Sequence, residues 1–257
     1  MTAAPADGLS LAVSGPEAAA LADAGDGNLV LRAARAYAAQ HRVAVGAALH
    51  LTKNLPVASG IGGGSSDAAA TLRALAVLWG LPLDDAAMRI AASLGADIPA
   101  CLDGRPLWLG GVGDRLLPLP GLPPLGVVLA NPRRALPTAS VFRARRGAFT
   151  TAAPPRVAPR SATALIGLLR PCRNDLAEAA IGLVPEIAAV LDRLAALPGT
   201  CLSRMSGSGA TCFALFAERR AAEDAAAALA AAEPGWWVKA GALLSAPVPL
   251  RPAGASP

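Results

Sequence analysis

Leu55-Pro56-Val57-Ala58-Ser59-Gly60-Ile61-Gly62-Gly63-Gly64-Ser65-Ser66-Asp67 is the most informative segment of this 257-residue sequence. Four glycines fall within residues 60–64. Glycine lets backbone amides approach a ligand without an obstructing side chain, and it adopts backbone angles that other residues avoid. Several such amides can converge on one phosphate group, so the spacing predicts a phosphate-binding loop.

A helix is expected directly after this loop, over residues 67–79. Apolar residues recur there at helical spacing, and Gly80 with Pro82 just beyond it forms a stop signal. The loop would then deliver its ligand to the positive end of the helix dipole. The residues expected to cap the N-terminus of this helix are Ser65, Ser66 and Asp67.

Two common glycine-rich motifs do not fit the loop. A Walker loop needs a lysine after the last glycine, where this sequence has Ser65. The dinucleotide fingerprint needs a glycine in the sixth place counted from Gly60, and that place is also Ser65. A flexible glycine-serine linker is the remaining alternative, which the helix and strand patterns on both sides disfavour.

Composition excludes several classes of protein. The hydrophobic fraction of 54% is raised by alanine, and charges interrupt every apolar run before the roughly 18 residues that a membrane span needs. Residues 1–15 have no basic residue and no apolar core, so the expected location is the cytoplasm, without a secretory signal. Four cysteines show neither disulfide nor metal spacing, so we expect buried free thiols and no protein-held metal: Cys101, Cys172, Cys201 and Cys212.

The net charge of +5 is unevenly distributed. Between Asp114 and Asp175 there is no acidic residue and there are ten arginines. Such a segment suits a solvated surface, an anionic small molecule or nucleic acid. Nucleic acid is disfavoured because the segment holds only two aromatic residues, Phe142 and Phe149, for base stacking.

Strand and helix patterns alternate irregularly along the chain, which predicts an α+β protein. A domain boundary is expected at residues 120–124, and a mobile surface loop at 148–159. Strands are predicted over residues 9–14, 43–51, 107–109, 115–119, 126–130, 200–205, 211–216 and 236–241. Helices are predicted over residues 28–41, 67–79, 84–94, 185–197 and 219–232.

Several motifs, in order, resemble the GHMP kinase superfamily, the group of galactokinase, homoserine kinase and mevalonate kinase. Residues 56–69 are similar to its central ATP-binding motif. Leu94-Gly95-Ala96-Asp97-Ile98-Pro99-Ala100-Cys101 is similar to a Gly-Ala-Asp-Val-Pro segment of its 4-diphosphocytidyl-2-C-methyl-D-erythritol kinases. Further matches are Asn28-Leu29-Val30, Lys53-Asn54-Leu55-Pro56, Gly111-Val112-Gly113-Asp114, Pro137-Thr138, Val141-Phe142, Arg173-Asn174-Asp175-Leu176 and Ser206-Gly207-Ser208-Gly209-Ala210.

The resemblance implies a two-domain fold. It places a ribosomal-protein-S5-like ATP-binding domain at residues 1–122 and a ferredoxin-like substrate domain at residues 123–257. It also implies ATP-dependent phosphorylation of the 2-hydroxyl of 4-diphosphocytidyl-2-C-methyl-D-erythritol in the non-mevalonate isoprenoid pathway. Mg²⁺ would accompany ATP. The partner would be this small molecule, not nucleic acid or membrane, and the chain would be a monomer or weak homodimer.

Residue roles follow from the same resemblance. Asp97 would be the catalytic base, with a plain helix N-cap as the alternative. The ATP-binding residues would be Pro56, Gly60, Gly62, Gly63, Gly64, Ser65, Ser66, Asn28 and Lys53, and the substrate-binding residues Thr138, Phe142, Gly207 and Gly209. Lys53 could instead be a solvated loop charge, Phe142 a core aromatic residue, and Gly207 and Gly209 part of a tight hairpin turn.

The chain departs from the family pattern at its start. Family members begin with a lysine-bearing strand and an Asp-Gly-Tyr-His segment. No lysine precedes Lys53, and the one tyrosine, Tyr37, falls in a predicted helix. We therefore expect that the first strand pair is absent, through a misplaced start or a truncated gene. A catalytically impaired nucleotide-binding remnant and another GHMP small-molecule kinase stay open as alternatives.

Overall fold

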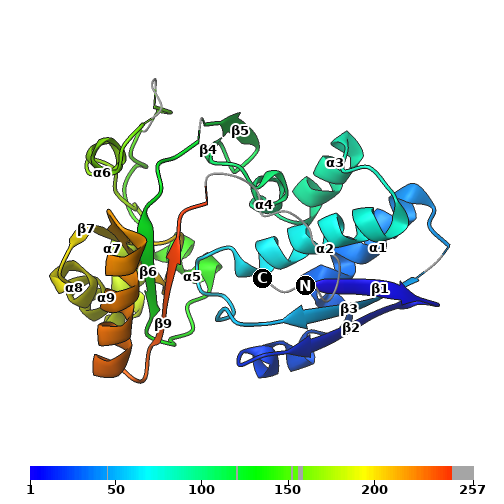
Figure 1. Cartoon of the computed structure of the whole chain (residues 1–257), viewed down its shortest axis with the longest axis horizontal. Coiled ribbons are helices and arrows are strands. Elements are labelled where there is room, and N and C mark those ends of the chain that lie inside the picture. The colour runs from blue at the N-terminus through cyan, green and yellow to red at the C-terminus, as the bar shows by residue number, and fades with distance from the viewer. Residues whose placement is uncertain (45, 120, 152, 156–158, 245–257) are drawn as a thin grey trace. The chain divides into compact units, whose positions relative to one another are not determined.

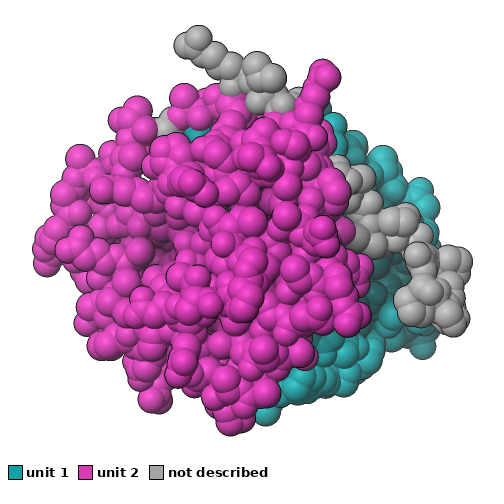
Figure 2. All heavy atoms as spheres, turned by 60° about the vertical axis from the view of Figure 1, so that its left-hand side comes forward, with its two compact units in different colours: residues 1–57, 62–118, 247–257 teal, residues 58–61, 119–246 magenta. Residues whose placement is uncertain are grey.

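The computed structural model describes residues 1–257 except 45, 120, 152, 156–158 and 245–257. The described residues form two compact units, coloured separately in Figure 2. Among the described residues, unit 1 holds residues 1–57 and 62–118, and unit 2 holds residues 58–61 and 119–244. The tip of the glycine loop therefore belongs to a different unit from the helix that follows it.

Unit 1 is built on a three-stranded sheet. Its central strand β3 (Gly46–Thr52) pairs antiparallel with β1 (Thr2–Ala6) and parallel with β2 (Leu9–Ser14). The parallel connection runs through the 3₁₀ helix η1 (Ala18–Gly27) and helix α1 (Leu29–His41). Alternate residues of β3 are buried, so one face of the sheet is apolar.

Helices cover that apolar face of unit 1. In Figure 1, α1 and α2 (Gly63–Trp79) lie over the sheet, and their buried residues share one core with it. Helices α3 (Asp85–Leu94) and α4 (Ile98–Asp103) extend this layer, and a hairpin of β4 (Leu107–Gly110) and β5 (Arg115–Pro118) follows. The largest fully buried side chains include Tyr37, Leu49, Leu72, Leu75 and Ile98.

Unit 2 is built on a four-stranded antiparallel sheet in the order β7-β8-β6-β9. These strands are β6 (Gly126–Asn131), β7 (Thr200–Met205), β8 (Cys212–Phe216) and β9 (Trp237–Ala242). Five helices accompany them: α5 (Thr138–Ala144), α6 (Ala162–Leu169), α7 (Ala177–Leu183), α8 (Glu186–Ala196) and α9 (Arg219–Ala232).

The sheet of unit 2 is buried on both faces. Along β8, Cys212, Ala214 and Phe216 belong to a core shared with α8 and α9. Phe213 and Leu215 belong to a separate core with α6. Because successive side chains of a strand point to opposite faces, the two cores must lie on opposite sides of the sheet. This explains why β8 is a nearly continuous apolar run.

The predicted α+β class is confirmed, and several local predictions are corrected. Helix α2 begins at Gly63, four residues before the predicted start. The strand at the N-terminus, η1 and the short helices α4 to α7 are additional to the predicted elements. Only Cys212 among the four free cysteines is buried, whereas the other three are partly exposed.

Two of the predicted segments include residues that lie outside the described ones. The predicted strand at 43–51 begins at Gly46, and residue 45 lies outside the described residues. The predicted mobile loop at 148–159 includes residues 152 and 156–158, which also lie outside them.

In the part of the chain that the structure describes, none of the helices combines the length and apolar character needed to cross a membrane.

Candidate active site

The N-terminus of α2 is formed by glycine and not by a capping side chain. Gly62 occupies the N-cap position with φ +66° and makes no side-chain bond. The first helical bond runs from the Ser66 amide to the Gly62 carbonyl over 2.8 Å. The amides of Gly63, Gly64 and Ser65 precede that bond and have no acceptor within the helix. These three donors, at the positive end of the helix dipole, can hold an anion.

The predicted capping role of Ser65, Ser66 and Asp67 is therefore wrong. These residues lie inside the first turns of α2, because the helix starts earlier than the sequence pattern suggested. Ser66 is exposed and Ser65 is partly exposed, and both lie in the same first turn as the three amides that have no acceptor within the helix.

Lys53 and Asp67 form an ion pair beneath this turn. The Lys53 side chain is 4% exposed, and its Nζ lies 2.6 Å from Oδ2 of Asp67, whose side chain is 20% exposed. Lys53 is thus not the solvated loop charge that its sequence context allows. A methyl group on Gly63 would lie 3.3 Å from the Lys53 Nζ.

Two other residues with a predicted role in ATP binding are buried in unit 1. Asn28 precedes α1, and its Oδ1 accepts a hydrogen bond from the Val30 amide over 2.9 Å, so it caps that helix. Pro56 is buried at the beginning of the loop. Asn28 thus supports α1, which shares its core with α2.

Asp97 lies at the start of α4, whose Cys101 contacts the first turn of α2. It occupies the N-cap position, but its exposed side chain makes no capping hydrogen bond, so the carboxylate is open to solvent. One helical turn further, Cys101 lies 3.6 Å from the Ser66 hydroxyl, measured from Sγ to Oγ. Burial, and to a lesser extent the nearby Asp97 carboxylate, raise the pKa of the Cys101 thiol. Ser66, Cys101 and Asp97 therefore form one cluster.

Unit 2 brings together a second group of predicted residues. The turn between β7 and β8 contains Gly207 and Gly209, and the Ser208 hydroxyl between them lies 2.9 Å from the Thr138 hydroxyl. The side-chain Nδ2 of Asn174 donates to the backbone carbonyls of Met205 and Gly207 over 2.9 and 2.8 Å, and so fixes the turn. The hairpin reading of this segment is correct, and it does not conflict with a ligand role.

Phe142 lies on α5, four residues after Thr138. It is 52% exposed, whereas its neighbour Val141 is fully buried. The alternative of a core aromatic residue is therefore wrong. An exposed phenyl ring offers a stacking surface to a flat ligand.

The tip of the glycine loop is bonded within unit 2. The Ser206 hydroxyl donates to the Gly60 carbonyl over 2.9 Å, and the Thr211 amide donates to the Ser59 carbonyl over 3.2 Å. Gly60 has φ +74°, and a methyl group there would lie 2.5 Å from the Gly209 carbonyl oxygen. Of the predicted loop glycines, Gly60 thus contacts the β7–β8 turn, while Gly62, Gly63 and Gly64 form the end of α2.

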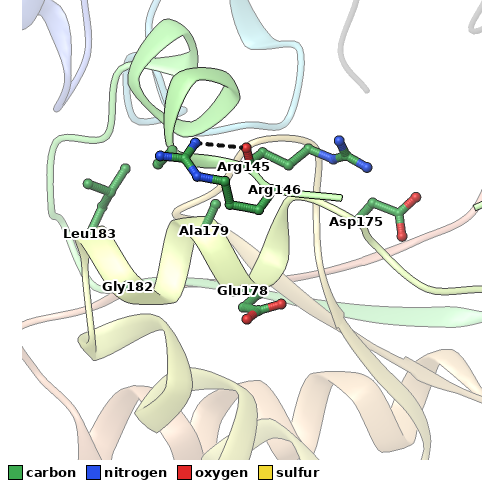
Figure 3. A pocket seen from close by; sticks show the side chains of 8 residues that line it. Arg145, Arg146, Asp175, Glu178, Ala179, Gly182 and Leu183 are labelled. Atoms are coloured by element: carbon green, nitrogen blue, oxygen red, sulfur yellow. Dashed lines mark hydrogen bonds between the residues drawn. The ribbon is translucent and has the colours of Figure 1, made fainter. Parts of the chain in front are cut away.

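A cavity of about 330 Å³ lies over α7 in unit 2, apart from the predicted residues. Figure 3 shows Arg145 and Arg146 on one side and Asp175 and Glu178 near α7. The Arg145 guanidinium stacks on Phe149 at 3.5 Å from the ring centre. Since this lining mixes both signs of charge, it is not a simple anion site.

Sequence reasoning missed several residues that shape the site: Asp67, Cys101, Asn174, Ser206 and Ser208. All five lie inside quoted motifs, so their presence was visible although their bonds were not. In the described residues, no group of three or more His, Cys, Asp or Glu side chains is placed to hold a metal ion.

Comparison with known proteins shows the family of this chain. The sequence matches the family described as GHMP kinases N terminal domain over residues 28–105, and GHMP kinases C terminal over residues 162–235. A Rhodospirillum rubrum protein named 4-diphosphocytidyl-2-C-methyl-D-erythritol kinase is 52% identical over 245 residues, covering 95% of this chain and 80% of that protein. A protein of the same name from Cereibacter sphaeroides is 54% identical over 237 residues, covering 91% and 82%.

One solved structure gives the same result. The crystal structure of a 4-(cytidine 5'-diphospho)-2C-methyl-D-erythritol kinase is 36% identical, has a TM-score of 0.71, and covers 94% of this chain and 83% of that chain. The chain therefore belongs to the GHMP kinases and, within them, to the 4-diphosphocytidyl-2-C-methyl-D-erythritol kinase family.

Proposed function

We propose that this chain transfers the γ-phosphoryl group of ATP to the 2-hydroxyl of 4-diphosphocytidyl-2-C-methyl-D-erythritol, in the non-mevalonate route to isoprenoid precursors. The observation that carries the proposal is the open N-terminus of α2 with an exposed carboxylate, Asp97, held beside it through Cys101 and Ser66. The names of relatives about half identical to this chain supply the substrate.

The end of α2 supplies the donors for the ATP phosphates. The amides of Gly63, Gly64 and Ser65 would donate to phosphate oxygens, and Gly62 turns the chain so that they point in one direction. Such preorganised donors stabilise the charge on a transferring phosphoryl group. ATP is assigned to the N-terminal domain, residues 1–122, and the second substrate to the C-terminal domain, residues 123–257.

The side chains around α2 also suit Mg²⁺. Phosphate-bound Mg²⁺ takes most of its ligands from phosphate and water, and needs only one or two from the protein. The described residues offer hydroxyls at Ser65 and Ser66, in the first turn of α2, as such ligands. When bound, the ion would neutralise charge on the ATP phosphates.

Asp97 would act as the general base. Its carboxylate would accept the proton of the attacking hydroxyl group, and its lack of a capping bond leaves both oxygens available. In unit 2, Thr138, Gly207 and Gly209 would contact the substrate phosphates, and Phe142 would stack on the cytosine ring. The exposure of Phe142 supports the stacking role, and the positive φ angles of Gly207 (+51°) and Gly209 (+83°) support a turn whose backbone carries no Cβ.

The Asp97→Asn variant tests the proposal. We expect kcat to fall about 10²- to 10⁴-fold, the range for a lost general base, while the melting temperature stays unchanged because the Asp97 side chain makes no capping hydrogen bond. Phosphate transfer is measured with ATP and the cytidylyl substrate. The control is Asp85→Asn, which removes an exposed carboxylate from the first turn of α3 and should leave kcat unchanged.

Two outcomes would count against the proposal. Wild-type protein that binds ATP without forming product would support a nucleotide-binding remnant. Faster turnover of homoserine or mevalonate than of the cytidylyl substrate would support another GHMP kinase activity.

A further inference from the structure

The backbone of Lys53 is fixed on the sheet of unit 1. Its amide donates to the Ser14 carbonyl over 2.7 Å, and its carbonyl accepts from the Glu17 amide over 3.1 Å. Gly15, with φ +98°, passes so close that a methyl group there would lie 2.6 Å from the Lys53 carbonyl oxygen. Lys53 therefore starts from a rigid point just after β3.

The side chain of Lys53 extends from that point to the first turns of α2. Its ammonium meets the carboxylate of Asp67, the fifth residue of the helix, and lies close to Gly63, the first. The Asp67 carbonyl accepts a hydrogen bond from the Thr71 hydroxyl one turn further along, over 2.8 Å. One ion pair thus joins the end of β3 to the turn that carries the three open amides.

The electrostatics of this place make the pair necessary. A buried ammonium beside the positive end of a helix is unfavourable by itself, both through lost hydration and through the helix dipole. The Asp67 carboxylate compensates it over 2.6 Å. Because each charge needs the other, the distance between β3 and the first turns of α2 is held within narrow limits.

We infer that Lys53 and Asp67 are positioning residues for phosphate binding. They hold the α2 amides in place from below and act on ATP through the helix, without contact between Lys53 and the adenine ring. The same geometry accounts for Gly63, where any side chain would press on both the Lys53 Nζ and Leu55. The inference rests on the proposed function, because it assumes that α2 binds the phosphates of ATP.

The test compares ATP with inorganic tripolyphosphate, which has no base, by calorimetry without the second substrate. The variants are Lys53→Met, Asp67→Asn, their combination, and Asp67→Glu. We expect each single variant to weaken both ligands by the same factor, about tenfold, which corresponds to a loss of roughly 1.4 kcal/mol. The combined variant should lose less than the product of the two single losses, because the residues act as a pair.

Asp67→Glu guards against simple unfolding. It keeps the negative charge, so the variant should melt near the wild-type temperature. It lengthens the side chain and so shifts the ion pair, and the variant should therefore bind tripolyphosphate more weakly than the wild type does. Asp26→Asn, which breaks the exposed Asp26–Arg35 ion pair of the same unit, is the matched control and should change neither affinity.

The outcomes separate the inference from the proposed function. Weaker ATP binding with unchanged tripolyphosphate binding would show that Lys53 contacts the base, and would overturn the inference. Unchanged affinity for both ligands in all variants, or losses that simply multiply, would also overturn it. Wild-type protein that binds ATP but not tripolyphosphate would contradict it as well, whereas wild-type protein that binds no ATP would contradict the proposed function itself.

Discussion

Cys101 is the residue that links the proposed base to the proposed phosphate site. It lies one turn after Asp97 on α4, and its sulfur touches the Ser66 hydroxyl of α2. Burial is the largest influence on this thiol, and it raises the pKa. The Ser66 hydrogen bond opposes that shift, and the Asp97 carboxylate adds to it. Cys101 can therefore report chemically on the state of the site.

We predict the pH dependence of Cys101 alkylation. Iodoacetamide reacts only with the thiolate form of cysteine. In a variant that carries Cys172→Ser and Cys201→Ser, the alkylation rate of Cys101 should therefore rise about tenfold per pH unit from pH 7 to 9. ATP should slow it by covering Ser66. Cys212 is the internal control, because burial raises its pKa to about 12 and should leave it unmodified. Mass spectrometry after timed quenching measures both thiols. A rate that levels off below pH 8, or is indifferent to ATP, would contradict the placement of Cys101.

At the scale of elements, the two ends of the glycine loop have different reasons to be glycine. Gly60 and Gly62 both have left-handed backbones, with φ +74° and +66°. At Gly62 a methyl group would meet nothing within 4 Å, whereas at Gly60 it would lie 2.5 Å from the Gly209 carbonyl oxygen. Gly62 is thus required by its conformation alone, and Gly60 by both its conformation and its packing.

Alanine substitutions should separate these two requirements. Gly62→Ala should cost about 1–2 kcal/mol of unfolding free energy, the usual strain of a left-handed non-glycine residue. Gly60→Ala should cost a further 1–3 kcal/mol or so, because the β7–β8 turn must move to admit the methyl group. Urea denaturation of both variants measures the difference. Equal losses would mean that the loop tip is not packed on the turn.

The elements also show what sequence can and cannot predict. The helical spacing of residues 67–79 was sufficient to predict α2, and the apolar run of residues 211–216 was sufficient to predict β8. The start of α2 was placed too late because glycine is a poor helix former, so Ser65 to Asp67 looked like the cap. Strand β1 was missed because it contains Pro5, which is tolerated at the edge of a sheet.

The candidate site was predictable in its residues but not in its bonds. Asp97 and the glycines stand in recognisable motifs. The burial of Lys53 depends on Asp67, fourteen residues away, and on the path of Gly15, and no local pattern encodes either. Likewise, Thr138 and Ser208 are seventy residues apart and meet only in the folded chain.

At the scale of the whole molecule, the stability of the fold at acid pH depends in part on the Asp175 carboxylate, which holds Thr150 in the loop after α5. Asp175 accepts hydrogen bonds from the Thr150 amide and hydroxyl, both over 2.6 Å, and pairs with Arg173. The Thr150 hydroxyl, then the Thr150 amide and Arg173, lower the pKa of Asp175 to about 2. The folded protein therefore favours the ionised form more than the unfolded chain does.

The sign of the pH effect follows from that direction. Asp175 stabilises the fold fully above the unfolded pKa of about 4, and this contribution disappears as the pH falls from 4 towards 2. The melting temperature of Asp175→Asn should therefore lie below that of wild type at pH 6, and the difference should close near pH 2. Asp224→Asn, which breaks an exposed pair on α9, is the control and should show little difference at any pH. A gap that persists at pH 2 would contradict the assigned pKa.

The placement of residues 58–61 in unit 2 has a consequence for engineering and for evolution by recombination. The C-terminal unit is not one contiguous gene segment, because four residues from the middle of the N-terminal sequence complete it. In a chimera that exchanges only the sequence after residue 118 between two relatives, the β7–β8 turn would come from one parent, and Ser59 and Gly60 would come from the other. The carbonyls of those two residues are the acceptors for Thr211 and Ser206. A crossover that respects the fold must therefore transfer this tetrapeptide together with the C-terminal half.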